Sequence, residues 1–98
     1  MHALAVLADD TRRGIVRLLA DDGELAAGDI AGRFAISQPA VSRHLRVLRE
    51  AGLVHERRDG RLRLYRANPD ALAELRDWID AYWAGRLDAL KRLAEEDG

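Results

Sequence analysis

The sequence predicts a single, mainly α-helical domain with one small β-hairpin and a long C-terminal helix. Three observations support this fold class. Apolar residues recur at helical spacing through most of the first half of the 98 residues. Two strand-like runs, 53–58 and 61–67, are joined by Asp59-Gly60. Helical spacing then returns from Pro69 to about Glu95. A chain of this length forms one domain, and a lone copy would be only marginally stable.

Residues 29–52 predict two helices joined by a tight turn. A short helix over 29–34 is followed by a turn at 35–36. Ser37 can cap the second helix, and Pro39 fits its first turn, where the missing N–H costs nothing. Gly52 is expected to end this helix in a left-handed conformation. The apolar stripe of the second helix consists of Val41, Leu45 and Leu48. Together these elements predict a helix-turn-helix.

The other face of the second helix carries amide, hydroxyl and guanidinium groups, with no acid before Glu50. Arg can bind guanine through two hydrogen bonds, and Gln can bind adenine in the same way. We therefore expect this helix to enter the major groove of DNA, the alternative being an ordinary solvated cationic face. His44 is expected to pack or to touch the DNA backbone. The DNA-binding candidates on this helix are Ser37, Gln38, Pro39, Ser42, Arg43, His44 and Arg46.

The hairpin over residues 53–67 predicts a wing beside the helix-turn-helix, the arrangement of a winged helix. Asp59-Gly60 between two strand-like runs is a strong turn signal, with both residues expected at positive φ. A two-stranded ribbon is marginal alone and must lean on the helices. Its tip gathers four guanidiniums around one acid, and phosphate contacts would relieve their repulsion. A solvated hairpin is the alternative. The candidate phosphate ligands are Arg57, Arg58, Arg61 and Arg63.

The charge is distributed unevenly, although the net value is only −1. Residues 1–32 hold three arginines against six acids, and residues 67–98 hold four basic residues against eight acids. Residues 33–66 hold nine arginines against three acids. The positive charge therefore falls on the predicted helix-turn-helix and wing. Such a distribution can steer DNA to one surface of the protein.

The last helix predicts a dimer. About 26 residues at 1.5 Å each would span about 40 Å, longer than so small a domain can cover. Asn68 can cap it, and its apolar stripe is too wide for one small core. We expect residues 1–8 and 69–96 to form the dimerisation helices of a two-fold homodimer, a long monomeric helix being the alternative. The interface candidates are Leu4, Leu7, Leu72, Leu75, Trp78, Ile79, Tyr82 and Trp83.

Other functions lack a signature in this sequence. It has no cysteine, no glycine-rich phosphate loop and no nucleophile motif. His2, His44 and His55 are not spaced as metal ligands. We expect no cofactor, no metal and no enzymatic activity. The N-terminus lacks the features of a signal peptide or a membrane span, so a cytoplasmic protein is expected.

Three segments resemble the ArsR (ArsR/SmtB) family of dimeric winged-helix repressors. They read LADDTRRGIVRLLADDGEL, ISQPAVSRHLRVLREAGLV and RRDGRLRLYRAN, and the second is the most specific. The resemblance implies a bacterial transcriptional repressor that a signal releases from its palindromic operator. It implies that the residues facing bases or phosphates are Ser37, Gln38, Ser42, Arg43 and the wing arginines.

The sequence departs from the metal-sensing members of that family. Where those often carry a thiolate pair, it reads ELAAGDI, with Ala26 and Gly28 at the cysteine positions. The last helix contains no histidine, whereas other members place metal ligands there. The resemblance is therefore to the branch without metal sites. Two alternatives stay open: a repressor with a small-molecule site beside Trp78 or Trp83, and a winged helix that binds proteins rather than DNA.

Overall fold

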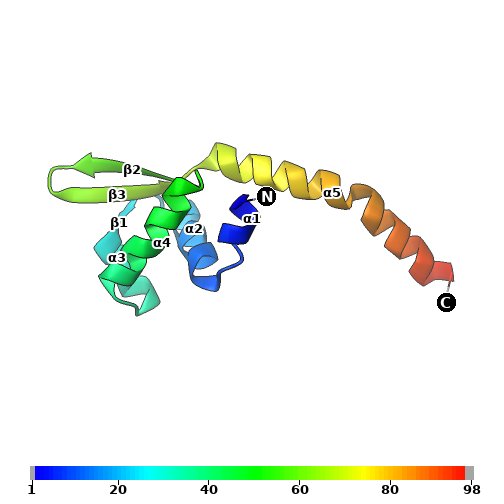
Figure 1. The fold of residues 1–98 in the computed structure, drawn as a ribbon, viewed down its shortest axis with the longest axis horizontal. Helices are drawn as coiled ribbons and strands as arrows, with labels where there is room; N and C mark the ends of the chain where they lie inside the picture. Colours follow the sequence, from blue (N-terminus) through cyan, green and yellow to red (C-terminus); the bar gives the residue numbers. More distant parts are fainter. Residues whose placement is uncertain (1, 97–98) are drawn as a thin grey trace.

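The computed structural model describes residues 2–96 and shows a winged helix-turn-helix with a long terminal helix (Figure 1). The hairpin projects from one end of the helical body, and the last helix leaves at the other, giving dimensions of 61 × 26 × 22 Å. The predicted fold class is confirmed. The elements in chain order are α1 (His2–Val6), α2 (Asp10–Asp22), β1 (Leu25–Ala26), α3 (Ala27–Phe34), α4 (Gln38–Glu50), β2 (Val54–Asp59), β3 (Leu62–Ala67) and α5 (Pro69–Glu96).

The core lies where α2, α3 and α4 meet the base of the hairpin. The predicted stripe of α4 is confirmed, since Val41, Leu45 and Leu48 are each fully buried. Burying an aliphatic side chain of this size stabilises the fold by roughly 1.5–3 kcal/mol. The remaining fully buried residues are Ile15 and Leu19 of α2, Ile30 of α3, and Leu53, which precedes β2.

Side-chain caps begin α2 and α4, and the cap of α4 is Ser37, as predicted. Asp9 Oδ2 accepts a hydrogen bond from the Arg12 backbone N–H at 2.9 Å, and Ser37 Oγ accepts one from that of Ala40 at 3.2 Å. Gly52 adopts a φ of 77° after α4, as predicted. The start of α3 differs from the prediction. The helix begins at Ala27, two residues before the predicted start at residue 29. Its N-cap position has no side-chain hydrogen bond, so no sequence signal marks it.

The sheet has three strands rather than the two predicted. Residues Leu25 and Ala26 pair antiparallel with Tyr65 and Leu64, which gives the strand order β1-β3-β2. Two residues are too few to show the alternating pattern that identifies a strand. Because β1 pairs with Leu64 and Tyr65, the middle of β3 is bonded to the segment that precedes α3. This pairing aligns the wing with the helix-turn-helix.

The turn of the hairpin lies one residue further along than predicted. Asp59 pairs with Leu62 at the end of the ladder, so the two-residue loop is Gly60 and Arg61. Positive φ occurs in this loop only at Gly60, at 61°, the pattern of a type II′ turn. The prediction that Asp59 adopts positive φ was wrong, because this turn requires it at the glycine alone. The shifted turn sets which residues lie directly opposite one another, and it places Arg63 opposite Arg58.

The last helix starts from the body and then leaves it. Asn68 accepts a hydrogen bond from the Ala71 backbone N–H at 3.4 Å, and its amide donates to the Gly52 carbonyl at 2.8 Å. This side chain therefore ties the start of α5 to the end of α4. The 28 residues of α5 span about 42 Å. No helix within residues 2–96 is both long and apolar enough to cross a membrane.

Candidate nucleic-acid interface

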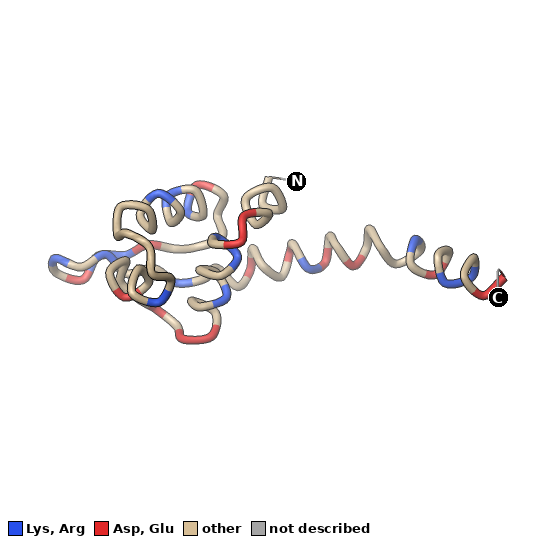
Figure 2. Tube along the Cα trace, turned by 90° about the horizontal axis from the view of Figure 1, so that it is seen from below, with Lys and Arg blue, Asp and Glu red and all other residues tan. Residues whose placement is uncertain are grey.

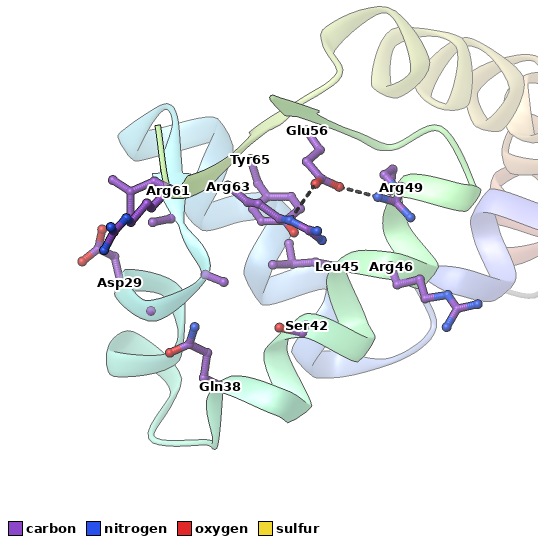
Figure 3. Close-up of a pocket in the computed structure, with 14 residues that line it drawn as sticks. Asp29, Gln38, Ser42, Leu45, Arg46, Arg49, Glu56, Arg61, Arg63 and Tyr65 are labelled. Carbon is purple, nitrogen blue, oxygen red and sulfur yellow. Dashed lines mark hydrogen bonds and ion pairs between the residues drawn. The ribbon is translucent and has the colours of Figure 1, made fainter. Parts of the chain in front are cut away.

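The recognition helix α4 and the wing line the two sides of one groove, with a volume of about 810 Å³ (Figure 3). Gln38, Ser42 and Arg46 contribute from α4, while Arg61 and Arg63 contribute from the wing. The buried side chains of Leu45 and Tyr65 form the floor. This volume suits a small molecule and not a duplex. A DNA duplex would instead lie across the mouth, where both elements can reach it.

Burial of one face of α4 turns its polar residues outward. Gln38, Pro39, Ser42, Arg43 and Arg46 are all exposed. We call these five residues the exposed arc of α4. Ser37 lies at the start of this arc, but its hydroxyl already accepts the capping hydrogen bond. The arc offers an amide, a hydroxyl and two guanidiniums, which are the groups that bind base edges and phosphates.

Positive charge is concentrated on the exposed arc and the tip of the wing (Figure 2). Within residues 2–96, no carboxylate forms an ion pair with Arg43, Arg58 or Arg61. Arg58 lies directly opposite Arg63 across the hairpin, and like charges at such positions repel. An approaching phosphate would relieve this repulsion.

Arg49 and Glu56 also line the groove, and neither was among the predicted site residues. The Glu56 carboxylate pairs with Arg49 Nη1, and its Oε1 lies 3.7 Å from Arg63 Nε (Figure 3). Arg49 follows Ser42 by seven positions, so helical periodicity places it on the same face of α4. Glu56 has no comparable signal, because its two partners come from different elements.

Arg57 lies on the opposite face of the hairpin from Arg58 and Arg63. It faces Leu64 in the ladder, and its guanidinium binds Glu24, with Nη2 2.6 Å from Oε1. Hydrogen bonds from Arg57 lower the pKa of the Glu24 carboxyl, and the carboxylate in turn raises the pKa of Arg57. The structure therefore does not bring Arg57 together with the other candidate phosphate ligands.

His44 points towards α2 rather than along the exposed arc. Its Nδ1 lies 4.0 Å from Asp9 Oδ2, and a quarter of its side chain is exposed. The pKa of Asp9 is lowered mainly by the hydrogen bond from the Arg12 backbone N–H, with smaller contributions that include His44. The structure thus places His44 at the contact between α4 and α2, the packing role that was one of its two predicted roles.

Comparison with known proteins connects this geometry to a family. Residues 9–56 match the family model described as "Bacterial regulatory protein, arsR family". The HTH-type transcriptional regulator Rv2034 of Mycobacterium tuberculosis is 44% identical over 97 residues, which cover 99% of this chain and 90% of that protein. The chain belongs to the ArsR family. It is a DNA-binding transcriptional regulator, and the family is not one of enzymes.

Other members agree in sequence and in fold. The arsenical resistance operon repressor of Escherichia coli is 45% identical, over 80% of this ArsR-family chain and 67% of that protein. A crystal structure described as a possible transcriptional regulator for arsenical resistance is 48% identical, with a TM-score of 0.81. It covers 92% of this chain and 93% of its own. Within residues 2–96 of this chain, no three His, Asp or Glu side chains gather as metal ligands.

The exposed part of α5 gives this ArsR-family chain a second surface. Trp78 stacks on Tyr82 with ring centroids 5.4 Å apart, and Trp83 meets Tyr82 edge-on at 5.1 Å. These three aromatic residues are each 41–43% exposed. Further along, the large apolar side chains that are 56–58% exposed are Leu87, Leu90 and Leu93. We call these six residues the α5 apolar surface.

Several predicted interface residues lie closer to the body. Leu75 is only 6% exposed in the single chain, so it is part of this chain's own fold and not free to contact a partner. Leu7 and Leu72 pack against the core while remaining half-buried. Leu4 and Ile79 are also half-buried. The predicted stripe therefore divides near Trp78 into a part that covers the body and a part that is left open.

Proposed function

We propose that this chain is a transcriptional repressor that binds a palindromic operator as a homodimer. The observation that carries the proposal is the shared groove, across whose mouth α4 and the wing both present donors. In this arrangement α4 enters the major groove, and the wing follows the adjacent phosphates. Repression is supported by the likeness to a relative that is named as a repressor.

The contacts divide into two kinds. Gln38, Ser42, Arg43 and Arg46 read base edges or hold phosphates from α4, with Ser37 and Pro39 beside the backbone at its N-terminus. Arg58, Arg61 and Arg63 bind phosphates from the wing. Arg57 and His44 are left out of the proposed contacts, because their side chains are directed to Glu24 and Asp9.

The proposed dimer is built on α5. Six exposed apolar side chains on one helix form a large surface, and soluble monomers rarely expose such patches. A second copy packed on the α5 apolar surface would bury it and add to the small hydrophobic core of a single chain. Two recognition helices about 34–36 Å apart would reach successive major grooves on one face of the duplex.

Fluorescence anisotropy tests this function directly. The duplex just upstream of the gene and a scrambled duplex are titrated at two salt concentrations. We expect tight, salt-sensitive binding to the native duplex and weak binding to the scrambled one. Arg43→Ala should weaken specific binding by about 1–3 kcal/mol if Arg43 reads a base. An equal loss of affinity for both duplexes would instead indicate that Arg43 contacts a phosphate.

Weak and equal binding to both duplexes contradicts an operator at that position. Charge reversal at Arg43 and Arg58 then distinguishes the remaining alternatives. A winged helix that binds only proteins would keep its partner in a pull-down after both reversals, whereas a DNA-binding protein directed to another operator would lose DNA binding.

A further inference from the structure

Glu56 occupies an unusual position for an acid in a DNA-binding surface. It lies in the groove between α4 and the wing, with only 15% of its side chain exposed. A carboxylate in this position repels phosphates, so by charge alone it would weaken DNA binding. Its surroundings give it another role, since it is paired with arginines from both sides of the groove.

The two arginines come from different elements. Arg49 belongs to the last turn of α4, and Arg63 belongs to the wing strand β3. Glu56 itself lies in β2 opposite Tyr65, two positions along the ladder from the pair Arg58 and Arg63. One carboxylate therefore links the recognition helix to the wing directly (Figure 3).

Both guanidiniums keep donors for other partners. A guanidinium has five N–H groups, and Glu56 occupies Nη1 of Arg49 and lies near Nε of Arg63. The side chains of Arg49 and Arg63 remain 47% and 58% exposed. Holding long side chains in one geometry before binding removes part of the ordering cost of association. Glu56 thus contacts two cations whose remaining N–H groups can reach phosphate.

We propose that Glu56 is a positioning residue for operator recognition, which orients Arg49 and Arg63 and fixes the wing relative to α4. This inference rests on the proposed DNA-binding function and deepens it. A positioning role and simple electrostatics predict opposite changes in operator affinity when Glu56 is neutralised. Neutralising an acid near DNA should raise affinity for every duplex, whereas losing a positioning residue should lower affinity for the operator in particular.

The test compares Glu56→Gln with the unaltered dimer by anisotropy on operator and scrambled duplexes at two salt concentrations. We expect operator affinity to fall by about 5- to 100-fold, as for two long side chains that lose their preorganisation. Binding to the scrambled duplex should stay constant or rise. A parallel rise on both duplexes, or a parallel fall on both, would overturn the proposal.

Asp59→Asn is the matched control. It removes the same charge from the same hairpin, and within residues 2–96 Asp59 has no ion-pair partner. It should raise affinity for both duplexes equally. If Glu56→Gln lowers the thermal midpoint too far to be studied, Glu56→Asp keeps the charge on a shorter stem and should lose part of the discrimination. Full discrimination in Glu56→Asp would contradict a role set by geometry.

A variant that lacks both arginine partners tests whether Glu56 acts through Arg49 and Arg63. In the variant Arg49→Gln with Arg63→Gln, adding Glu56→Gln should cause no further loss of operator discrimination. A further loss equal to that in the unaltered protein would overturn the proposal. Measurements on the unaltered protein distinguish a failure of the proposed function from a failure of the role proposed for Glu56. If the unaltered protein fails to discriminate the duplexes, the proposed function fails, and if it and Glu56→Gln discriminate equally well, only the role of Glu56 fails.

Discussion

The guanidinium of Arg57 donates hydrogen bonds to both carboxylate oxygens of Glu24, 33 positions earlier in the chain. Nε lies 3.0 and 2.8 Å from the two oxygens, and Nη2 lies 2.6 Å from Oε1. This contact fastens the outer face of the wing to the connection between α2 and β1. It also neutralises one of the four arginines near the hairpin tip, whereas the neighbouring Arg58 has no carboxylate partner within residues 2–96.

The link between Glu24 and Arg57 predicts a pH-dependent contribution to stability. The pKa of Glu24 in the fold lies below its ordinary value of 4.5 because of Arg57. The contribution is therefore present above the ordinary value and is lost as the pH falls through the lowered one. We expect Glu24→Gln to be less stable than the unaltered protein at pH 7 and equally stable in acid below the lowered pKa, measured by urea unfolding at one protein concentration.

Glu74→Gln is the control for that measurement, because Glu74 is exposed on α5. It should match the unaltered protein at both pH values. A stability difference for Glu24→Gln that persists in acid would show that the side chain acts through packing and not through its charge.

The two neighbouring wing arginines should differ in their effect on DNA binding. Arg58→Gln should weaken binding to every duplex, because one phosphate contact is lost. The slope of log K against log salt, which is negative, should become shallower by about 1. Arg57→Gln should leave this slope nearly unchanged, since its guanidinium is already held by Glu24. Equal slopes for the two variants would contradict the assignment of the two faces of the hairpin.

The turn of the helix-turn-helix contains a removable backbone strain. Ala35 adopts a φ of 53°, in the left-handed region that disfavours residues with a Cβ. Ala35→Gly should therefore stabilise the protein by about 0.5–1 kcal/mol, despite the larger entropy of the unfolded glycine. The change in stability is measured by thermal unfolding. Ala20→Gly, in the regular helix α2, should destabilise by a similar amount. Loss of stability in both variants would argue against strain at Ala35.

Two helical glycines should respond oppositely to alanine. A Cβ added at Gly14 would lie 2.7 Å from Phe34 Cε1, so α2 and α3 pack closely at this point. At Gly32 the space is open. Gly32→Ala should stabilise by about 1 kcal/mol through helix propensity. Gly14→Ala should be less stable than Gly32→Ala by about 1–3 kcal/mol, because the ring must move. Equal stability would show that Phe34 yields without cost.

The α5 apolar surface should control the proposed dimerisation without controlling the fold. Trp83→Glu with Leu87→Glu places charges on exposed positions of α5, away from the core. We expect monomers by light scattering, with helical content retained in circular dichroism. Leu75→Asp is the contrasting variant, which should unfold the chain because Leu75 is buried within it. An intact dimer carrying both glutamates would contradict an interface on this part of α5.

Local sequence signals determined the helix-turn-helix, its caps and the positions of the wing strands. Asp9, Ser37 and Asn68 act on N–H groups three residues away, so their roles depend on neighbours along the chain. The burial of Val41, Leu45 and Leu48 follows from helical periodicity alone. These features could be predicted because short-range geometry contains all the information they need.

Only the tertiary structure decided which polar side chains share a surface. The strand β1 is visible only in its pairing with β3, and the position of the turn decides that Arg63, rather than Arg61, lies directly opposite Arg58. The contact between Glu56 and two arginines depends on how α4 meets the wing. Strand register and the direction of each side chain are set by contacts between segments that are distant in sequence. The sequence by itself therefore determined the kind of protein, and the packing of its elements determined which candidate residues remain available to DNA.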